Sequence, residues 1–95
     1  LCFMIAAQRW IMPLNLAMRA GERPTYRNGR LLTGRTVGLH GCGNIGKEVV
    51  RMLKPFGCTI LACDIKDYSN FYVANGVTPV SFDELLERSE VLSLH

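Results

Sequence analysis

A glycine-rich stretch at the centre of this 95-residue chain constrains its fold more than any other feature. Residues 37–53 read VGLHGCGNIGKEVVRML. Gly41, Gly43 and Gly46 have the spacing G-x-G-x-x-G, whereas Gly41, Gly46 and Lys47 have the spacing G-x-x-x-x-G-K. Both spacings are typical of a turn that leads from a strand into a helix and binds phosphate groups with backbone amides. The neighbouring residues decide between the two patterns.

The residue after Lys47 excludes the second pattern. A nucleoside-triphosphate loop needs Ser or Thr at that position, because the hydroxyl binds the magnesium ion that bridges the terminal phosphates. Here the position is Glu48, whose carboxylate would face the phosphate oxygens and repel them. The first pattern, which is the dinucleotide fingerprint, remains.

Each glycine of this fingerprint has its own expected role. Gly41 permits a tight exit from the strand, Gly43 lets the backbone approach a pyrophosphate, and Gly46 lets the helix pack closely on the sheet. The amides from Asn44 to Gly46 then donate to the phosphates, assisted by the positive end of the helix dipole. The stretch therefore predicts a pyrophosphate site at the start of a helix.

Asp64 supports the same interpretation from the next strand-like segment. It stands 18 residues after Gly46, where the fingerprint expects an acid that accepts hydrogen bonds from the adenosine ribose hydroxyls. A carboxylate there repels the 2′-phosphate of NADP, so we predict NAD as the cofactor. Lys66, two residues later, argues in the other direction. The structural alternative is that Asp64 only forms a turn at a strand end.

The chain from residue 36 onward alternates strand-like and helix-like segments. Strands are predicted at 36–40, 58–64, 77–80 and 91–95, and helices from about residue 45 to 54, at 68–76 and at 81–89. Strands that alternate with helices pair in parallel through right-handed crossovers. The prediction is an α/β fold, a partial doubly wound sheet of Rossmann type with strand order 3-2-1-4.

Two local features of the helices are predicted as well. Ser81 is expected to cap the last helix, with Glu84 completing a capping box and pairing with Arg88. In the helix after the glycines, Lys47 is expected to point toward water. The apolar face of that helix is predicted to hold Ile45, Val49, Val50 and Leu53.

The first 20 residues predict a helical segment that is neither a membrane span nor a signal peptide. Polar residues such as Gln8 and Arg9 interrupt its apolar run, and Pro13 would kink a long helix. A connection rich in Gly, Pro and Arg follows, with a turn signal at Asn28–Gly29. We expect residues 1–30 to form an N-terminal helix and connection, and residues 31–95 to form part of an NAD-binding domain.

Charge and cysteine content narrow the possible partners. The net charge of +3 divides into nine basic against two acidic residues in 1–55, and two against six in 56–95. The arginines between residues 19 and 30 have no accompanying aromatic platform, and Pro24 breaks any helical face, so we predict no nucleic-acid partner. The four cysteines lack metal-ligand spacing. We expect reduced thiols in a cytoplasmic protein, and no metal site.

Two stretches resemble the D-isomer-specific 2-hydroxyacid dehydrogenases: LLTGRTVGLHGCGNIGKEVVRMLKPFGCTILACD at 31–64 and VTPVSFDELLERSEVLSLH at 77–95. The resemblance is strongest to their D-3-phosphoglycerate dehydrogenase branch. It implies an oxidoreductase that transfers hydride between a D-2-hydroxy acid, with 3-phosphoglycerate as a candidate, and NAD. It also implies that the N-terminal helix crosses from a substrate domain, and that the full-length enzyme is a homodimer or a larger homo-oligomer.

The resemblance assigns cofactor binding to the glycine turn and to the acid. Two residues depart from the family pattern: Asn44 stands where Arg or His is frequent, and Cys42 replaces an apolar residue. The residues that the likeness assigns to the cofactor are Gly41, Cys42, Gly43, Asn44, Ile45, Gly46 and Asp64.

Neither histidine of the chain is assigned to catalysis. The catalytic arginine, histidine and glutamate of the resembling family would lie beyond His95, so we expect the chain alone to be inactive. His40 is interpreted as a strand-end side chain, because no acid is visible to orient it. His95, at the end of the last strand, is expected to line the cofactor site.

Two other classes of function remain open from the sequence. One is a non-catalytic NAD-sensing module, which usually begins near its first strand, whereas 35 residues precede the strand here. The other is an NAD-regulated partner-binding relative of the same dehydrogenases.

Overall fold

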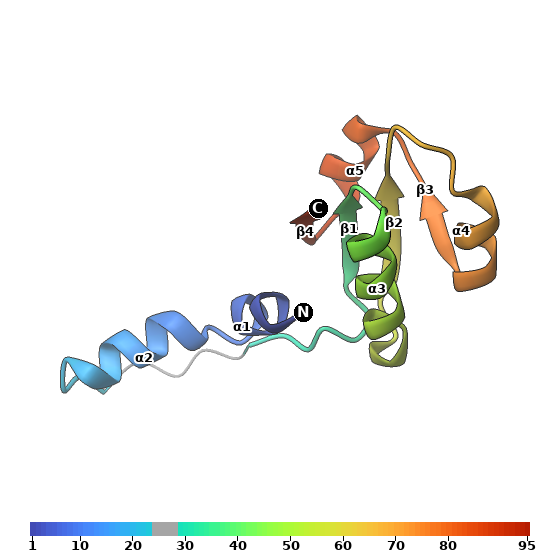
Figure 1. The fold of residues 1–95 in the computed structure, drawn as a ribbon. Helices are drawn as coiled ribbons and strands as arrows, with labels where there is room; N and C mark the ends of the chain where they lie inside the picture. Colours follow the sequence, from blue (N-terminus) through green and yellow to red (C-terminus); the bar gives the residue numbers. More distant parts are fainter. Residues whose placement is uncertain (24–28) are drawn as a thin grey trace. The chain divides into compact units, whose positions relative to one another are not determined.

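A computed structural model describes residues 1–23 and 29–95 of the chain. It separates into two compact units, residues 1–32 and residues 33–95. Figure 1 shows the helices of the first unit and the sheet of the second. The turn expected at Asn28–Gly29 and the helix-breaking role of Pro24 involve residues outside the described part of the chain.

The first unit contains two short helices, α1 (Cys2–Gln8) and α2 (Ile11–Arg19), in place of the single helical segment expected. The break falls at Trp10, whose φ of 57° is left-handed. Pro13 does not cause it, because Pro13 lies in the first turn of α2, where backbone N–H groups have no partner in the helix.

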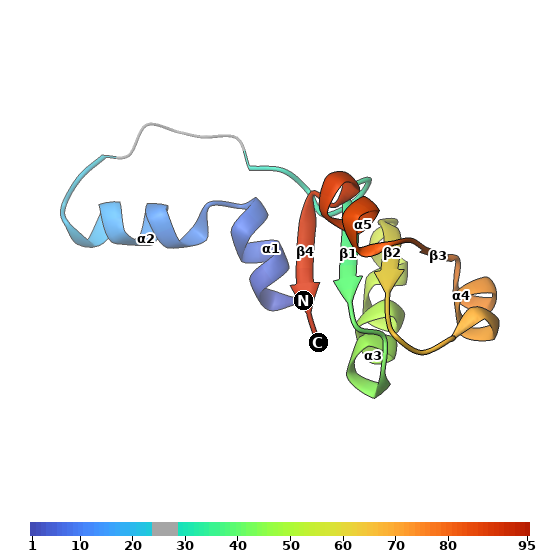
Figure 2. The same cartoon turned by 90° about the horizontal axis from the view of Figure 1, so that it is seen from above.

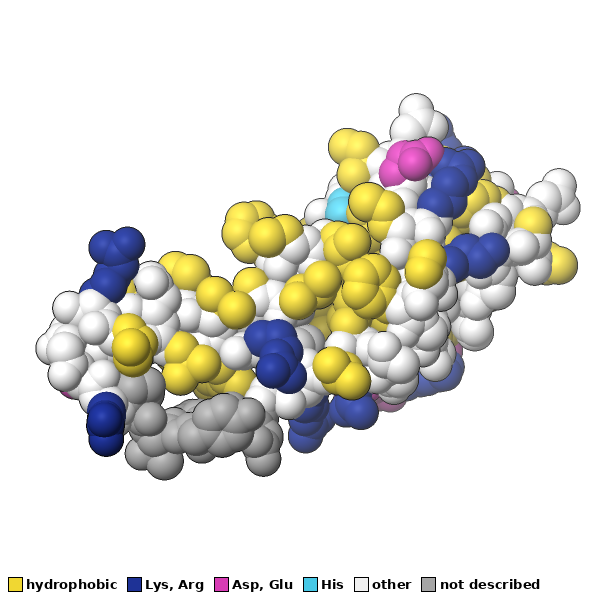
Figure 3. Space-filling view, turned by 90° about the horizontal axis from the view of Figure 1, so that it is seen from below, with side chains coloured by type: hydrophobic (Ala, Val, Ile, Leu, Met, Phe, Trp, Pro, Cys, Tyr) yellow, Lys and Arg dark blue, Asp and Glu magenta, His cyan; other side chains and the backbone are white. Residues whose placement is uncertain are grey.

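Apolar side chains of α1 and α2 are prominent at the surface (Figure 3). No residue of α2 is buried, and Leu16 and Met18 are more than half exposed. None of the helices in the described residues is long and apolar enough to cross a membrane.

The second unit is built on a parallel sheet with the order β3-β2-β1-β4, which confirms the predicted order 3-2-1-4. β4, β1 and β2 run side by side in Figure 2. The predicted strand limits agree within one residue of those observed, as is usual for assigned ends. The strands are β1 (Thr36–His40), β2 (Thr59–Cys63), β3 (Val77–Pro79) and β4 (Val91–Leu94).

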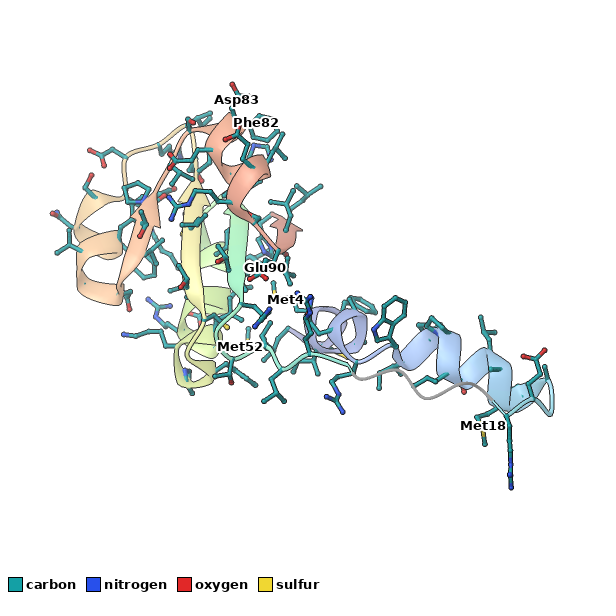
Figure 4. All side chains as sticks on the ribbon, turned by 180° about the vertical axis from the view of Figure 1, so that it is seen from behind. Met4, Met18, Met52, Phe82, Asp83 and Glu90 are labelled. Atoms are coloured by element: carbon teal, nitrogen blue, oxygen red, sulfur yellow. The ribbon has the colours of Figure 1, made fainter. Side chains whose placement is uncertain are left out.

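Three α-helices connect these strands. Right-handed crossovers place α3 (Asn44–Leu53) and α4 (Ser69–Asn75) on one face of the sheet and α5 (Phe82–Arg88) on the other. Figures 1 and 4, which view opposite sides, show α3 and α5 on opposite faces. The core lies between these layers. It includes Val37, Leu39, Leu61, Val50, Leu53 and Leu85, each with no exposed surface.

One predicted core residue of α3 is wrong. Ile45 is 70% exposed, while Val49, Val50 and Leu53 are buried as expected. Ile45 lies in the first turn of α3, and its exposure shows that its side chain is directed away from the core.

The capping interactions of α5 are observed only in part. The Ser81 hydroxyl accepts a hydrogen bond from the Glu84 amide at 3.2 Å, as in a capping box. The Glu84 carboxylate accepts from Arg88 at 2.9 Å, which confirms the pair four residues apart. At the amino edge of the sheet, Glu90 accepts from the Thr36 amide at 2.8 Å and from Arg35 at 3.1 Å, which ties the start of β4 to β1.

Gly38 in the middle of β1 is required by packing. A Cβ at this position would collide with the Ser89 hydroxyl and would lie 3.0 Å from Leu85 Cδ1. The absence of a side chain at residue 38 therefore allows α5 to approach the sheet closely.

Gly38→Ala should lower the free energy of unfolding by about 1–3 kcal/mol, the usual cost of overpacking a core. Urea unfolding followed by circular dichroism measures it. Gly43→Ala is the matched control, because a Cβ at residue 43 meets no atom within 4 Å. Because Gly43 is the N-cap of α3 and Ala is a poorer cap than Gly, the effect of Gly43→Ala should be a loss of no more than about 1 kcal/mol. Equal losses in both variants would contradict the packing argument.

Candidate nucleotide-binding site

The carboxyl ends of three strands meet at one edge of the sheet, and the predicted site residues follow them. Gly41 comes after β1, Asp64 after β2 and His95 after β4. The Gly41 amide donates to the Cys63 carbonyl at 2.8 Å, and the His95 amide donates to the His40 carbonyl at 2.9 Å. Parallel pairing thus brings together Gly41 and His95, which are 54 positions apart in the sequence.

The turn after β1 requires glycine at two positions, because of its backbone conformation and its close contacts with the rest of the chain. Gly41 has a φ of 101°, which side chains rarely adopt, and a Cβ there would collide with the His95 carbonyl oxygen. A Cβ at Gly46 would lie 2.7 Å from the Gly41 carbonyl oxygen. The close approach expected of Gly46 is therefore made to the turn itself.

Gly43 differs from both of these glycines. Its φ is −70°, which any residue can adopt, and a Cβ at residue 43 would meet nothing within 4 Å. Packing within the described chain gives no reason for a glycine there. Open space beside the backbone is what a ligand needs if it is to approach this position closely.

The first turn of α3 presents backbone donors beside this open space. The first hydrogen bond of the helix runs from the Lys47 amide to the Gly43 carbonyl at 2.9 Å. The amides of Asn44, Ile45 and Gly46 precede it and have no acceptor within the helix. The side chains of Asn44 and Ile45 are exposed. A helix start of this kind attracts an anion through its N–H groups and its dipole.

Asp64 lies within hydrogen-bonding distance of the glycine turn. Its Oδ2 accepts from the Cys42 amide at 2.7 Å, and its Oδ1 accepts from the Lys66 amide at 2.9 Å. The second contact is the local strand-end turn considered as an alternative, and the first links β2 to the glycine turn. The strand-end turn is therefore observed, and the binding of ribose by Asp64 stays a prediction.

The Cys42 and Lys66 amides lower the pKa of Asp64 below its ordinary value, because hydrogen bonds from N–H groups favour the ionised carboxylate. Burial opposes this effect only in part. An ionised carboxylate with two oxygens can accept further hydrogen bonds, so Asp64 retains capacity for a ligand's hydroxyl groups.

Cys42 fills the inside of the turn and has no exposed surface. Burial raises the pKa of its thiol, and the nearby Lys47 ammonium offsets only part of that effect. The thiol is therefore neutral near pH 7. A neutral, buried thiol is unreactive, as suits a small side chain that packs a tight turn.

The two histidines occupy different surroundings. The exposed His95 contacts Ser93 Oγ through Nε2 at 2.9 Å, and its carbonyl lies against Gly41. The ring of His40 lies 5.0 Å from the ring of Phe82, which begins α5 (labelled in Figure 4). No carboxylate among the described residues contacts His40, so nothing there orients it as a base.

The surroundings of Lys47 and Tyr72, near the turn, were not predicted from the sequence. Lys47 was expected to point into water, but its Nζ lies 3.9 Å from the centre of the Tyr68 ring. It borders a cavity of about 330 Å³ together with residues 67–71. Tyr72 of α4 is buried, and its ring makes edge contacts with Tyr68 and Phe71 at centroid distances of 6.3 and 6.4 Å. The aromatic residues at 68, 71 and 72 were the available signal for this cluster.

Fold and site together define a class of protein. A doubly wound parallel sheet, a glycine turn with free helix amides and an acid at the end of the second strand are the features of a dinucleotide-binding domain. The whole chain, residues 1–95, matches the family described as D-isomer specific 2-hydroxyacid dehydrogenase, NAD binding domain. The chain belongs to this family.

Individual relatives differ in the substrates that their names state. The chain is 39% identical over 82 residues to a D-specific alpha-keto acid dehydrogenase of Enterococcus faecium, covering 82% of this chain and 24% of the relative. It is 35% identical over 112 residues to a glycerate dehydrogenase of Cucumis sativus, covering 96% and 29%. The chain thus spans less than a third of these proteins.

A solved structure supports the fold over nearly the whole chain. A phosphoglycerate oxidoreductase from Rhizobium etli superposes with a TM-score of 0.88 at 27% identity, covering 98% of this chain and 32% of that one. The three names point to different substrates, so the branch of the family is not resolved by likeness.

The depressed pKa of Asp64 predicts how stability varies with pH. Its contribution should be fully present above the ordinary carboxyl pKa of 3.8 and lost as the pH falls through the lower value of the folded state. The stability difference between the wild type and Asp64→Asn should therefore shrink below about pH 4. Urea unfolding at a series of pH values measures this, with a carboxyl NMR titration as the control. A titration midpoint at or above 3.8 would contradict it.

Proposed function

We propose that this chain binds the adenosine ribose and the pyrophosphate of NAD, in a dehydrogenase that transfers hydride between a D-2-hydroxy acid and NAD. The observation that carries this proposal is the 2.7 Å hydrogen bond between the Cys42 amide and Asp64. It joins the two halves of the fingerprint, which are 22 residues apart in the sequence, into one site.

In this proposal each part of the site binds a different part of the cofactor. The open backbone at Gly43 and the amides of Asn44 to Gly46 bind the pyrophosphate. Asp64 accepts from the ribose hydroxyls, while Gly41 and Cys42 hold the turn. His95, at the end of β4, lines the side of the site toward the nicotinamide.

The substrate of the whole protein is proposed to be a small D-2-hydroxy acid. 3-Phosphoglycerate is the first candidate, because the two stretches at 31–64 and 77–95 resemble the D-3-phosphoglycerate dehydrogenase branch most strongly. Glycerate is the comparison to test beside it, given the name of the cucumber relative.

The setting of the whole protein is part of the proposal. The exposed apolar side chains of α2 suit burial against the rest of the protein or a second subunit of a homo-oligomer. The four cysteines all lie in the described residues and none forms a disulfide, which suits the reducing cytoplasm.

Asp64→Ala should weaken NAD binding and narrow the preference for NAD over NADP, because the ribose acceptor and the charge that repels the 2′-phosphate are both lost. Calorimetric titration of both cofactors measures this, and a loss of about tenfold or more is expected for NAD.

Asp64→Asn is the matched control. It keeps an oxygen that can accept from the Cys42 amide but removes the charge. Asp64→Asn should narrow the preference for NAD over NADP, and it should lose less NAD affinity than Asp64→Ala does. If both variants bind both cofactors as the wild type does, Asp64 does not contact the ribose.

The purified 95-residue chain should bind NAD without catalysing hydride transfer. The described residues place neither histidine beside a carboxylate, and a general base needs such an orienting partner. The appearance of reduced cofactor, followed by its absorbance in the presence of several 2-hydroxy acids, tests this. Steady turnover would show that the catalytic groups are present after all.

A further inference from the structure

We propose that Lys47 is a further binding residue for the pyrophosphate of the cofactor, and that the ring of Tyr68 holds its ammonium group in position for that contact. This inference rests on the proposed function, because it adds a charged side chain to the same site. Neither residue belongs to the dinucleotide fingerprint, which binds phosphates through backbone amides.

Lys47 lies one helical turn after Gly43, on the same side of α3. Its amide donates to the Gly43 carbonyl at 2.9 Å, which is the contact that begins the helix. Residues four apart lie above one another on a helix, and helical side chains lean toward its amino end. The Lys47 side chain therefore leans back toward the glycine turn.

The ammonium group of Lys47 connects the start of α3 with the segment that follows Asp64. Its Nζ lies 3.9 Å from the centre of the Tyr68 ring and 5.6 Å from the centre of the Phe71 ring. Tyr68 stands four residues after Asp64 and immediately precedes α4. The cation is therefore held beside the two segments that are proposed to bind the pyrophosphate and the ribose.

An aromatic ring, rather than a carboxylate, is the partner of this cation. In the part of the chain that the structure describes, Lys47 forms no ion pair, whereas Arg51, one turn further along α3, pairs with Glu48. Asp67 borders the same cavity, but its Oδ1 accepts from the Ser69 amide at 2.9 Å. A cation–π contact orients an ammonium group without neutralising it. Lys47 can therefore interact with an anion through its full charge.

The charge of Lys47 is accessible and acts on the glycine turn. Its side chain is only partly buried and borders a cavity of about 330 Å³. Burial raises the pKa of the Cys42 thiol, and the Lys47 charge opposes this rise, so its field reaches the turn. Lys47 is also the only basic residue between positions 41 and 50, so no other side chain there can compensate the charge of a pyrophosphate.

Removal of the charge of Lys47 tests the proposal. Lys47→Met keeps a long unbranched side chain against the rings, whereas Lys47→Arg keeps the charge. NMR titrations with NAD, ADP and adenosine measure binding, after circular dichroism has shown that each variant is folded. Lys47→Met should weaken the binding of NAD and ADP about tenfold, the usual effect of one contact with a charged group, and change adenosine binding less than about twofold. Lys47→Arg should bind all three within about threefold of the wild type.

Arg51→Met is the matched control on the same helix. The Arg51 guanidinium lies 5.7 Å from the centre of the Phe71 ring but is paired with Glu48, so the affinity for all three ligands should change less than about twofold. The loss in Lys47→Met should also shrink in about 1 M salt, where the screening length falls to about 3 Å. A loss that is equal for adenosine, or that does not depend on salt, would indicate a packing effect and overturn the proposal.

The positioning role of Tyr68 is tested through Lys47. Tyr68→Phe keeps an aromatic ring and should bind NAD as the wild type does. Tyr68→Leu should weaken NAD binding about two- to fivefold, because the ammonium group is no longer held in place before the ligand binds. In the Lys47→Met background Tyr68→Leu should change affinity less than about twofold, since the cation is already absent. An equal loss in both backgrounds would refute the positioning role.

Inorganic pyrophosphate separates this inference from the proposed function, because it lacks both nucleosides of the cofactor. It should shift the Lys47 side-chain resonances of the wild type, and Lys47→Met should bind it about tenfold more weakly. If the wild type bound pyrophosphate in this way but not NAD, the proposed function would fail and the role of Lys47 would stand. If NAD bound but Lys47→Met bound both ligands as tightly as the wild type, only the role of Lys47 would fail. Absence of binding of either ligand would overturn both.

Discussion

The hydrogen bond from the Cys42 amide to the Asp64 carboxylate is the interaction on which the site depends. It connects the loop after β1 with the loop after β2, which the parallel sheet has already placed side by side. Because the donor is a backbone amide and the acceptor an ionised carboxylate, the bond is of the charge-assisted kind and is short at 2.7 Å. The glycine turn and the acid are thus one structural unit before any ligand is present.

The rest of residues 33–95 supports the glycine turn and Asp64 in their positions. β4 pairs with β1 and brings the His95 carbonyl against Gly41, where only a glycine fits. α5 packs close to β1 because Gly38 has no side chain, and α4 lies on the other face of the sheet.

Sequence patterns predicted the order of the strands, because it follows from periodicity and from the fixed geometry of parallel crossovers. The hydrogen bond between Asp64 and the Cys42 amide was not predicted. Asp64 could be identified because its distance from the glycines reflects the length of one helix and one strand. The exposure of Ile45 could not be predicted, because helical periodicity does not show which residues of the first helical turn lie beyond the core. Likewise, the contact of Lys47 with the Tyr68 ring could not be predicted, because the two residues are far apart in the sequence. The left-handed Trp10 has no signal among its neighbours, since such a conformation is rarely adopted outside glycine.

The two occupied oxygens of Asp64 have a consequence for how such a domain could change its cofactor. An acid that only contacted the ribose could be exchanged freely during evolution for a residue that tolerates an extra phosphate. Here the carboxylate holds a backbone amide of the loop beside it, so the exchange would disturb the glycine turn. A successful switch would need a second substitution that restores an acceptor for that amide, and the two changes would have to arise together or in a fixed order.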